Sequence, residues 1–223
     1  MSSLGSLLVQ VAIYGVAAAC AAPVAAVVSA VILGKSSRPV ISTWTFVAGA
    51  AFLDIVFSAV ILAADLFENG GDAGAIVDVG LGVLFVAMGL IAVFQAESPE
   101  KDAVQRARVD KIATAKLATL FGAGFLVQVI NFDAIAVFGG ALKDIGEADI
   151  TTGQELIATL FGLAILLSVY YVPVLIYMID RKRAEPMLAR MTEWIMGNLR
   201  MIEIVVGLGF GVYFLAKGLA VLV

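Results

Sequence analysis

Six long apolar stretches divide this chain, and their length limits the fold more than any other feature of the sequence. They cover approximately residues 7–34, 42–66, 75–96, 113–142, 153–179 and 201–221. A helix needs about 20 mostly apolar residues to cross a bilayer, and every stretch is long enough. Of the 223 residues, 62% are hydrophobic and only 14% are charged, too few to cover a soluble protein. We predict an all-α membrane protein with six transmembrane helices in a single domain, residues 1–223.

The loops between these stretches alternate in charge. Loops two and four, around 65–72 and 144–149, are acidic. Loops one, three and five carry 12 of the 14 basic residues, namely Lys35, Arg38, Lys101, Arg106, Arg108, Lys111, Lys116, Arg181, Lys182, Arg183, Arg190 and Arg200. Because basic loops tend to stay in the cytoplasm, we predict that both termini lie outside, in a multi-pass protein of the bacterial cytoplasmic (inner) membrane.

Two segments have alternative interpretations. The small residues before Cys20 are similar to a secretory or lipoprotein signal, but such signals begin with basic residues, and the first one here is Lys35. We therefore expect an uncleaved spanning helix. Residues 183–199 have apolar positions at helical spacing with basic neighbours. They fit either a short helix on the inner membrane surface or an ordinary loop helix.

The charged third loop separates two halves, about 1–98 and 112–223, with three apolar stretches each. An odd number of spans places the halves in opposite orientations, which is the arrangement of an inverted repeat. AAPVAAVVSAVILGK in stretch one aligns with INFDAIAVFGGALKD in stretch four. Proline removes a backbone donor and clashes with the preceding turn, so we expect Pro23 to break stretch one and Pro173 to break stretch five.

Two acidic residues lie inside apolar stretches, Asp54 in the second and Asp133 in the fourth. A carboxylate at this depth costs several kcal/mol and usually faces the interior of the helix bundle or water. Lys217 and Arg200 lie near opposite ends of stretch six, so we expect neither to reach a central site. Protonation or a bound cation would offset the cost of burial.

We predict a substrate- or ion-binding site around these carboxylates. Asn131 and Gln128 have an alternative role, because intramembrane amides often join helices by hydrogen bonds. Asp78 and Glu203 lie near the ends of their stretches, and we place them at the membrane interface. The predicted site consists of Asp54, Asp133, Asn131, Pro23, Gln128, Tyr170 and Pro173.

Several function classes fit the sequence poorly. The chain has no histidine and one cysteine, which excludes histidine-based catalytic sites and an internal disulfide framework. We find no phosphate-binding loop, and the basic loops lack the interleaved aromatic residues of nucleic-acid binders. We expect no enzymatic activity, no cofactor and no nucleic-acid partner, and leave open whether a metal binds. A redox role for Cys20 is an alternative, although membrane thiol relays generally use cysteine pairs.

Two segments, one near each end of the sequence, are similar to those of a known membrane-protein family. VPVLIYMIDRKRAEPMLARMTEWIMGNLRMIEIVVGLGFGVYFLAKGLAVL and AAPVAAVVSAVILGKSSRPVISTWTFVAGAAF resemble the GAP family of peptidoglycolipid- and sulfolipid-addressing proteins, within the lysine exporter (LysE) superfamily. The resemblance implies a three-plus-three repeat and outward movement of envelope glycolipids or other small molecules. Where it implies Asn-Pro-Lys, this chain has Asn131-Phe132-Asp133, which is closer to cation exporters, although stretch one lacks their acidic residues.

We therefore predict an exporter of an envelope (glyco)lipid or small molecule, coupled to protons or cations through the intramembrane aspartates. The expected partners are membrane lipid and the transported lipid, small molecule or cation, and a homo-oligomer is compatible with the sequence. One alternative is a cadmium-type cation exporter or an amino-acid exporter. Another is a membrane scaffold that assembles envelope lipids without transporting them.

Overall fold

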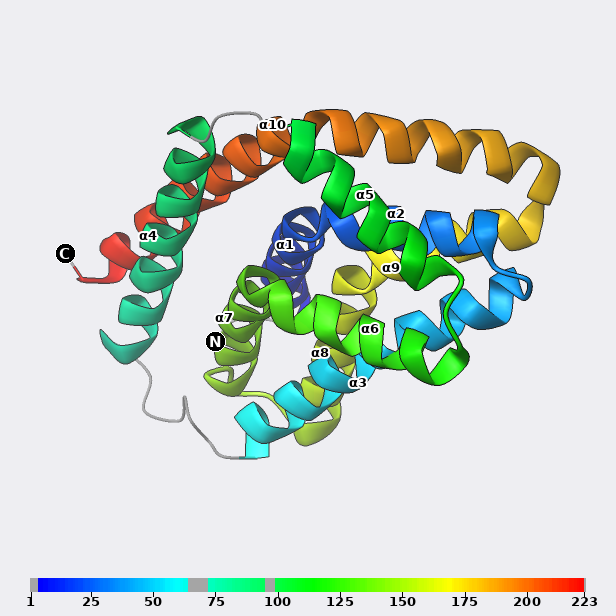
Figure 1. Ribbon diagram of the computed structural model, residues 1–223. Helices are drawn as coiled ribbons and strands as arrows, with labels where there is room; N and C mark the ends of the chain where they lie inside the picture. The colour runs from blue at the N-terminus through cyan, green and yellow to red at the C-terminus, as the bar shows by residue number, and fades with distance from the viewer. Residues whose placement is uncertain (1–3, 64–71, 95–98, 223) are drawn as a thin grey trace.

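The computed structural model describes residues 4–63, 72–94 and 99–222, and every regular element among them is a helix (Figure 1). This confirms the predicted all-α class. In chain order the helices are α1 (Leu4–Ala21), α2 (Pro23–Lys35), α3 (Pro39–Ala63), α4 (Asp72–Phe94), α5 (Pro99–Ala113), α6 (Leu117–Ile130), α7 (Phe132–Gly146), α8 (Thr152–Leu166), α9 (Ser168–Ile179) and α10 (Arg181–Leu222).

The helices are long and apolar enough for a membrane protein. Among the described residues, α1, α3 and α10 each qualify as a membrane span by length and composition. Two bent pairs qualify together, α6 with α7 at 73° and α8 with α9 at 68°. α4 contributes a shorter apolar helix over residues 78–94. The structure thus has three to five candidate spans, and the sixth stays a prediction.

Two of the helix breaks share a pattern. α1 ends before Ala22, which has φ −114° and ψ 46°, and α2 then begins with Pro23. Proline is tolerated at the first position of a helix because the missing N–H would have had no intrahelical partner. Stretch one therefore breaks beside Pro23, as predicted. Asn131 has φ −78° and ψ 51° between α6 and α7, so both helices break at the two aligned segments of the sequence.

The break in stretch five lies elsewhere than predicted. α8 ends before Leu167 and α9 starts at Ser168, while Pro173 lies inside α9. A proline disturbs the turn that precedes it, and this break lies six residues before Pro173. The Tyr171 hydroxyl donates a hydrogen bond of 2.9 Å to the Ala164 carbonyl, so a side chain holds the two helices together across the bend.

The surface helix proposed for residues 183–199 is part of a longer element. α10 runs for 42 residues without interruption, so the loop five segment and the sixth apolar stretch form one helix. Leu188 and Met196 on its first half are 3% and 6% exposed. That half packs against α2 and α9 through Leu188, so the protein itself covers part of its apolar surface, while Trp194 is 57% exposed.

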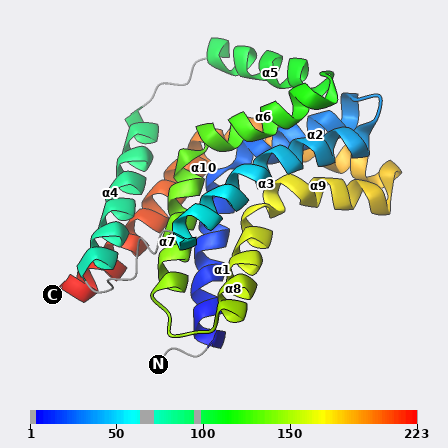
Figure 2. The same cartoon turned by 90° about the horizontal axis from the view of Figure 1, so that it is seen from below.

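Glycines set two close helix crossings. A Cβ atom on Gly49 would lie 2.0 Å from the Phe121 oxygen, and one on Gly124 would lie 1.9 Å from the Phe46 oxygen. α3 and α6 therefore touch backbone to backbone. Gly89 and Gly207 bring α4 and α10 equally close, since a Cβ on Gly207 would lie 2.7 Å from the Gly89 Cα. In both views α4 lies beside the C-terminal half of α10, at one side of the molecule (Figures 1 and 2).

Candidate functional site

The structure joins three of the predicted site residues in one buried chain of hydrogen bonds. Asp54 on α3 is 1% exposed, and Gln128 on α6 and Tyr170 on α9 are fully buried. The Gln128 Nε2 donates to Asp54 Oδ1 at 2.8 Å, and the Tyr170 hydroxyl donates to Gln128 Oε1. The amide therefore orients the carboxylate, and the phenol orients the amide.

One oxygen of Asp54 has no such support. Its Oδ2 is buried and has no hydrogen-bond partner among the described residues. Ser58, one turn later, donates to the main-chain oxygen of Asp54 at 2.7 Å and leaves the carboxylate untouched. A buried polar atom without a partner is unfavourable and uncommon. In chemical terms, a proton or a cation would satisfy this oxygen.

Asn131 connects this chain to a cavity. Its Nδ2 donates to the Tyr170 hydroxyl at 3.5 Å, and the residue also lines a cavity of about 210 Å³. Since Asn131 lies at the break between α6 and α7, a movement of these helices would shift both the hydrogen bond and the cavity wall.

The cavity contains two further predicted residues and one that was placed elsewhere. Pro23 and Asp133 line it, and so do Glu203 from α10 and Cys20 from α1. Glu203, which the sequence interpretation placed at the membrane interface, is an exposed residue of α10 and lines the same space as Asp133. A volume of this size would hold about seven water molecules. Two carboxylates in so small a space favour an occupant that is positively charged.

Not all of the predicted residues come together. Asp54 does not line the cavity, and Asp133 is not part of the hydrogen-bonded chain, so Asn131 is the link between the two aspartates. Pro173 is buried on α9, three residues after Tyr170, and does not line this cavity. The predicted residues thus form two adjoining parts, a buried chain and a small acidic cavity.

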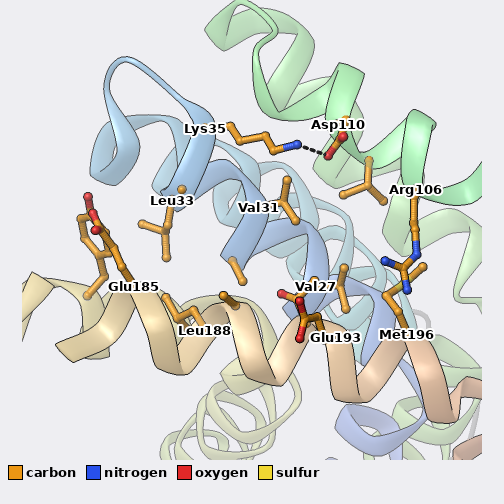
Figure 3. A pocket seen from close by; sticks show the side chains of 16 residues that line it. Val27, Val31, Leu33, Lys35, Arg106, Asp110, Glu185, Leu188, Glu193 and Met196 are labelled. Carbon is orange, nitrogen blue, oxygen red and sulfur yellow. Dashed lines mark ion pairs between the residues drawn. The ribbon is translucent and has the colours of Figure 1, made fainter. Parts of the chain in front are cut away.

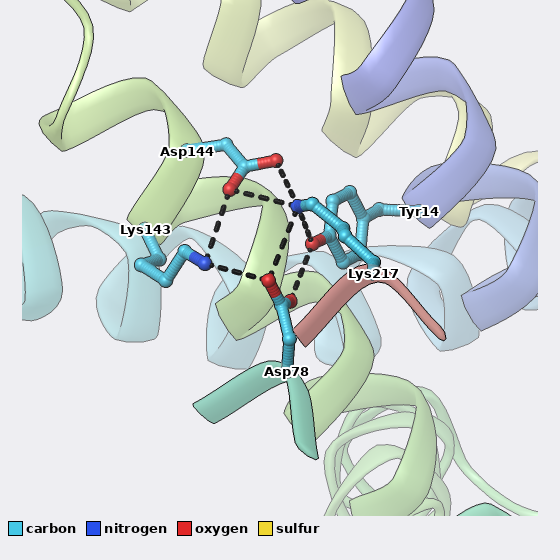
Figure 4. A network of polar contacts seen from close by, with 5 residues as sticks. All are labelled: Tyr14, Asp78, Lys143, Asp144 and Lys217. Atoms are coloured by element: carbon cyan, nitrogen blue, oxygen red, sulfur yellow. Dashed lines mark hydrogen bonds and ion pairs between the residues drawn. The ribbon is translucent and has the colours of Figure 1, made fainter. Parts of the chain in front are cut away.

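A second buried polar group was missed by the sequence interpretation. Figure 4 shows it: Tyr14 from α1, Asp78 from α4, Lys143 and Asp144 from α7, and Lys217 from α10. The Tyr14 hydroxyl donates to Asp78 Oδ1 at 2.8 Å, and Lys143 Nζ lies 2.9 Å from Asp78 Oδ2. Lys217 Nζ lies 2.7 Å from Asp144 Oδ2 and also donates to the Tyr14 hydroxyl. We call these five residues the ion-pair cluster.

The ion-pair cluster corrects one placement. Asp78 was predicted at the interface, yet it is only 2% exposed, and Lys143, beside the fourth loop, is only 3% exposed. Lys217 contacts Asp144 and Tyr14, which lie apart from the predicted site around Asp54 and Asp133. One signal was available, because Lys143 and Lys217 are the two basic residues outside the three basic loops.

Comparisons with known proteins identify the family. The family model described as Sap, sulfolipid-1-addressing protein, matches residues 11–220. No curated protein and no solved structure matches the chain. The match covers both halves of the chain, from the first helix to the last, and confirms the resemblance drawn from the sequence. The chain belongs to the sulfolipid-1-addressing protein family, and it is a membrane protein built from apolar helices.

Proposed function

We propose that this protein is an inner-membrane exporter that moves an envelope lipid or another small molecule outward. The description of its family names the addressing of a sulfolipid. From this description we infer that the exported molecule is an amphiphile. The observation that carries the proposal is the buried Asp54 carboxylate, one oxygen of which has no partner among the described residues. Intramembrane carboxylates of this kind are typical of proton- and ion-coupled transporters.

The proposed architecture is the inverted repeat of six spans, with both termini outside. Three features support it. The helix breaks at Ala22 and Asn131 fall in the two aligned segments, the last helices of the two halves, α4 and α10, pack as a pair, and α2, α5 and the start of α10 bring the three basic loops to one end. Transporters with such repeats place their sites at broken helices near the middle of the bilayer.

In the proposed cycle Asp54 binds a proton or a cation at its unpartnered oxygen. Gln128 holds the other carboxylate oxygen in place. A movement of Asp54 would shift Gln128 and, through the hydrogen bonds of Tyr170, would also shift Asn131 in the cavity wall. Discontinuous helices can change their angle at a break with little loss of hydrogen bonding. Movement at Ala22 and Asn131 would then open the cavity to one side of the membrane at a time.

Cation export is a second candidate, and the cavity favours it. Asp133 and Glu203 face the same space of about 210 Å³, which is below the range of typical small-molecule sites, about 300–1,000 Å³. A metal ion with some of its waters would fit this space without rearrangement, whereas a lipid head group would require the cavity to widen. In this version Asp133 and Glu203 bind the transported ion itself.

Transport by purified protein in liposomes tests both candidates. The vesicles carry a pH indicator and, in a separate series, a fluorescent cadmium indicator, under an imposed proton gradient. We expect Asp54→Asn to abolish proton movement, because the unpartnered oxygen is replaced by an amide that does not ionise. Ser58→Ala is the matched control, since Ser58 touches only the main chain of Asp54, and should behave like the unmodified protein.

Cells test the lipid cargo. The lipids at the outer surface are extracted from cells that carry the unmodified protein or Asp54→Asn, and their amounts are compared. Loss of a surface lipid together with loss of proton movement supports lipid export, and cadmium movement without a change in lipids supports cation export. If the unmodified protein moves neither ion, and cells with Asp54→Asn keep normal surface lipids, the protein is a scaffold instead.

A further inference from the structure

A larger cavity lies at the end of the molecule where the basic loops gather, apart from both buried polar groups. It measures about 420 Å³ and lies between α2, α5, α9 and α10 (Figure 3). None of the predicted site residues lines it. We call it the loop-end cavity.

The walls of the loop-end cavity are apolar. One part of them is formed by Leu33 from α2, Tyr177 from α9 and Leu188 from α10, which belong to a small separate core cluster. Val27, Val31 and Met196 continue the apolar lining toward α5. The volume is within the range of small-molecule sites, and an apolar lining of this kind suits a hydrocarbon chain.

Charged side chains line the mouth, and most of them neutralise one another. Lys35 forms an ion pair of 2.7 Å with Asp110, and Glu185 forms one of 2.8 Å with Arg181. Two charged lining residues are left, Arg106 on α5 and Glu193 on α10, and neither has an ion-pair partner among the described residues. In Figure 3 both charged groups point into the space between α5 and α10.

A buried hydroxyl provides independent evidence for a ligand. Tyr177 lines the cavity and is 4% exposed. Its hydroxyl is buried and has no hydrogen-bond partner among the described residues. Buried hydroxyls nearly always find a partner, so one of the lining residues holds an unsatisfied polar group, and the mouth of the cavity has two unmatched charges of opposite sign.

We propose that the loop-end cavity binds a zwitterionic phospholipid. The phosphate pairs with Arg106, the ammonium group pairs with Glu193, and one hydrocarbon chain lies against Leu33 and Leu188. An anionic lipid would leave Glu193 unmatched and repelled, and a cationic amphiphile would do the same to Arg106. The site is separate from Asp54, so it holds whether or not the protein is an exporter.

Binding of chain-labelled lysophospholipids to the full-length protein in detergent tests this site directly. The probes are fluorescent lysophosphatidylethanolamine and lysophosphatidylglycerol, which differ in the charge of the head group. We expect the zwitterionic probe to bind about tenfold more tightly, because only its ammonium group forms a charge-assisted hydrogen bond with Glu193. Arg106→Gln and Glu193→Gln should each weaken its binding by about the same factor.

The controls separate this site from general detergent-like binding. Arg190→Gln changes an exposed charge on the same helix that does not line the cavity, and should bind the probe normally. Leu188→Trp fills the cavity and should abolish binding, and its folding is checked by size-exclusion chromatography. Equal binding of the two probes, or normal binding by both charge variants, would overturn the proposal even if Leu188→Trp removed binding.

Discussion

The two buried polar groups of this protein differ in how their charges are balanced. The ion-pair cluster contains two carboxylates and two ammonium groups, and each of them lies within 3.4 Å of an opposite charge. The chain around Asp54 has one carboxylate, supported by one amide, and one oxygen without a partner among the described residues. Paired charges hold each other in one arrangement. A carboxylate oxygen without a partner can bind a proton or a cation and release it again. We infer that the first group holds helices together and that the second works in transport.

Removing one charge from the ion-pair cluster should have the largest effect on stability. Lys217→Met leaves Asp144 with only the 3.4 Å contact to Lys143 and removes a donor from Tyr14. We expect a loss of about 3–5 kcal/mol, because a buried carboxylate loses its nearest cation. The free energy of unfolding is measured by titration with sodium dodecyl sulfate in mixed micelles.

Two further variants make this test specific. Lys182→Met removes an exposed lysine from the same helix and should change the stability little. The double variant Lys217→Met, Asp144→Leu removes both partners and should recover part of the loss, since replacing a whole buried pair is often nearly neutral. If Lys217→Met were as stable as the unmodified protein, the cluster would not hold the helices together.

A single methyl group at the α3–α6 crossing should have the next largest effect. Gly124→Ala places a Cβ 1.9 Å from the Phe46 oxygen, so the helices must separate. Overpacking of this kind costs about 1–3 kcal/mol. Gln128 lies one turn further along α6, so the same shift should move its amide away from Asp54 and lower transport as well.

The matched control for the crossing is Gly122→Ala, on the same helix. A Cβ at Gly122 would meet no atom within 4 Å, so this variant should keep both stability and transport. Thermal unfolding and the liposome assay are carried out on both variants. Normal transport by Gly124→Ala would show that the hydrogen bond between Gln128 and Asp54 does not need the close crossing.

Tyr14→Phe should have a smaller effect, because it removes a hydrogen-bonding group and leaves all four charges. The Tyr14 hydroxyl donates to Asp78 and accepts from Lys217. We expect a loss of about 1.5–3 kcal/mol, the range for hydrogen bonds to charged groups, which is below the loss expected for Lys217→Met. The same unfolding titration measures it. A loss as large as that of Lys217→Met would mean that the hydroxyl, and not the charges, organises the cluster.

The helices and the hydrogen-bonded residues around Asp54 could be predicted from the sequence for one physical reason. Long apolar runs have few alternatives to a spanning helix, and a polar residue inside such a run must face the protein. Asp54, Gln128, Asn131 and Tyr170 stand out on that basis. The sequence does not show which of these residues form pairs. Asp54 and Gln128 are 74 positions apart, and they meet because two glycines allow α3 and α6 to cross closely.

The ion-pair cluster was not accessible in the same way. Asp78, Lys143 and Lys217 lie near the ends of apolar stretches, where long charged side chains usually reach the interface. Whether they turn inward depends on which helices pack around them. The bend at Leu167 could not be predicted either, because no proline or glycine lies at it. The presence of Pro173 led to a predicted break at the wrong turn of the helix.

Asp54→Asn should have the smallest effect on stability of all these variants, and this result separates the two polar groups most clearly. The amide keeps an oxygen for the Gln128 Nε2 donor, and no cation loses its partner. We expect a change of less than about 0.5 kcal/mol, or a gain, because a buried carboxylate is costly to desolvate. Transport should nevertheless be lost. A loss of stability comparable to that of Lys217→Met would mean that Asp54 has a bound partner at rest, and the contrast between a structural and a working carboxylate would fail.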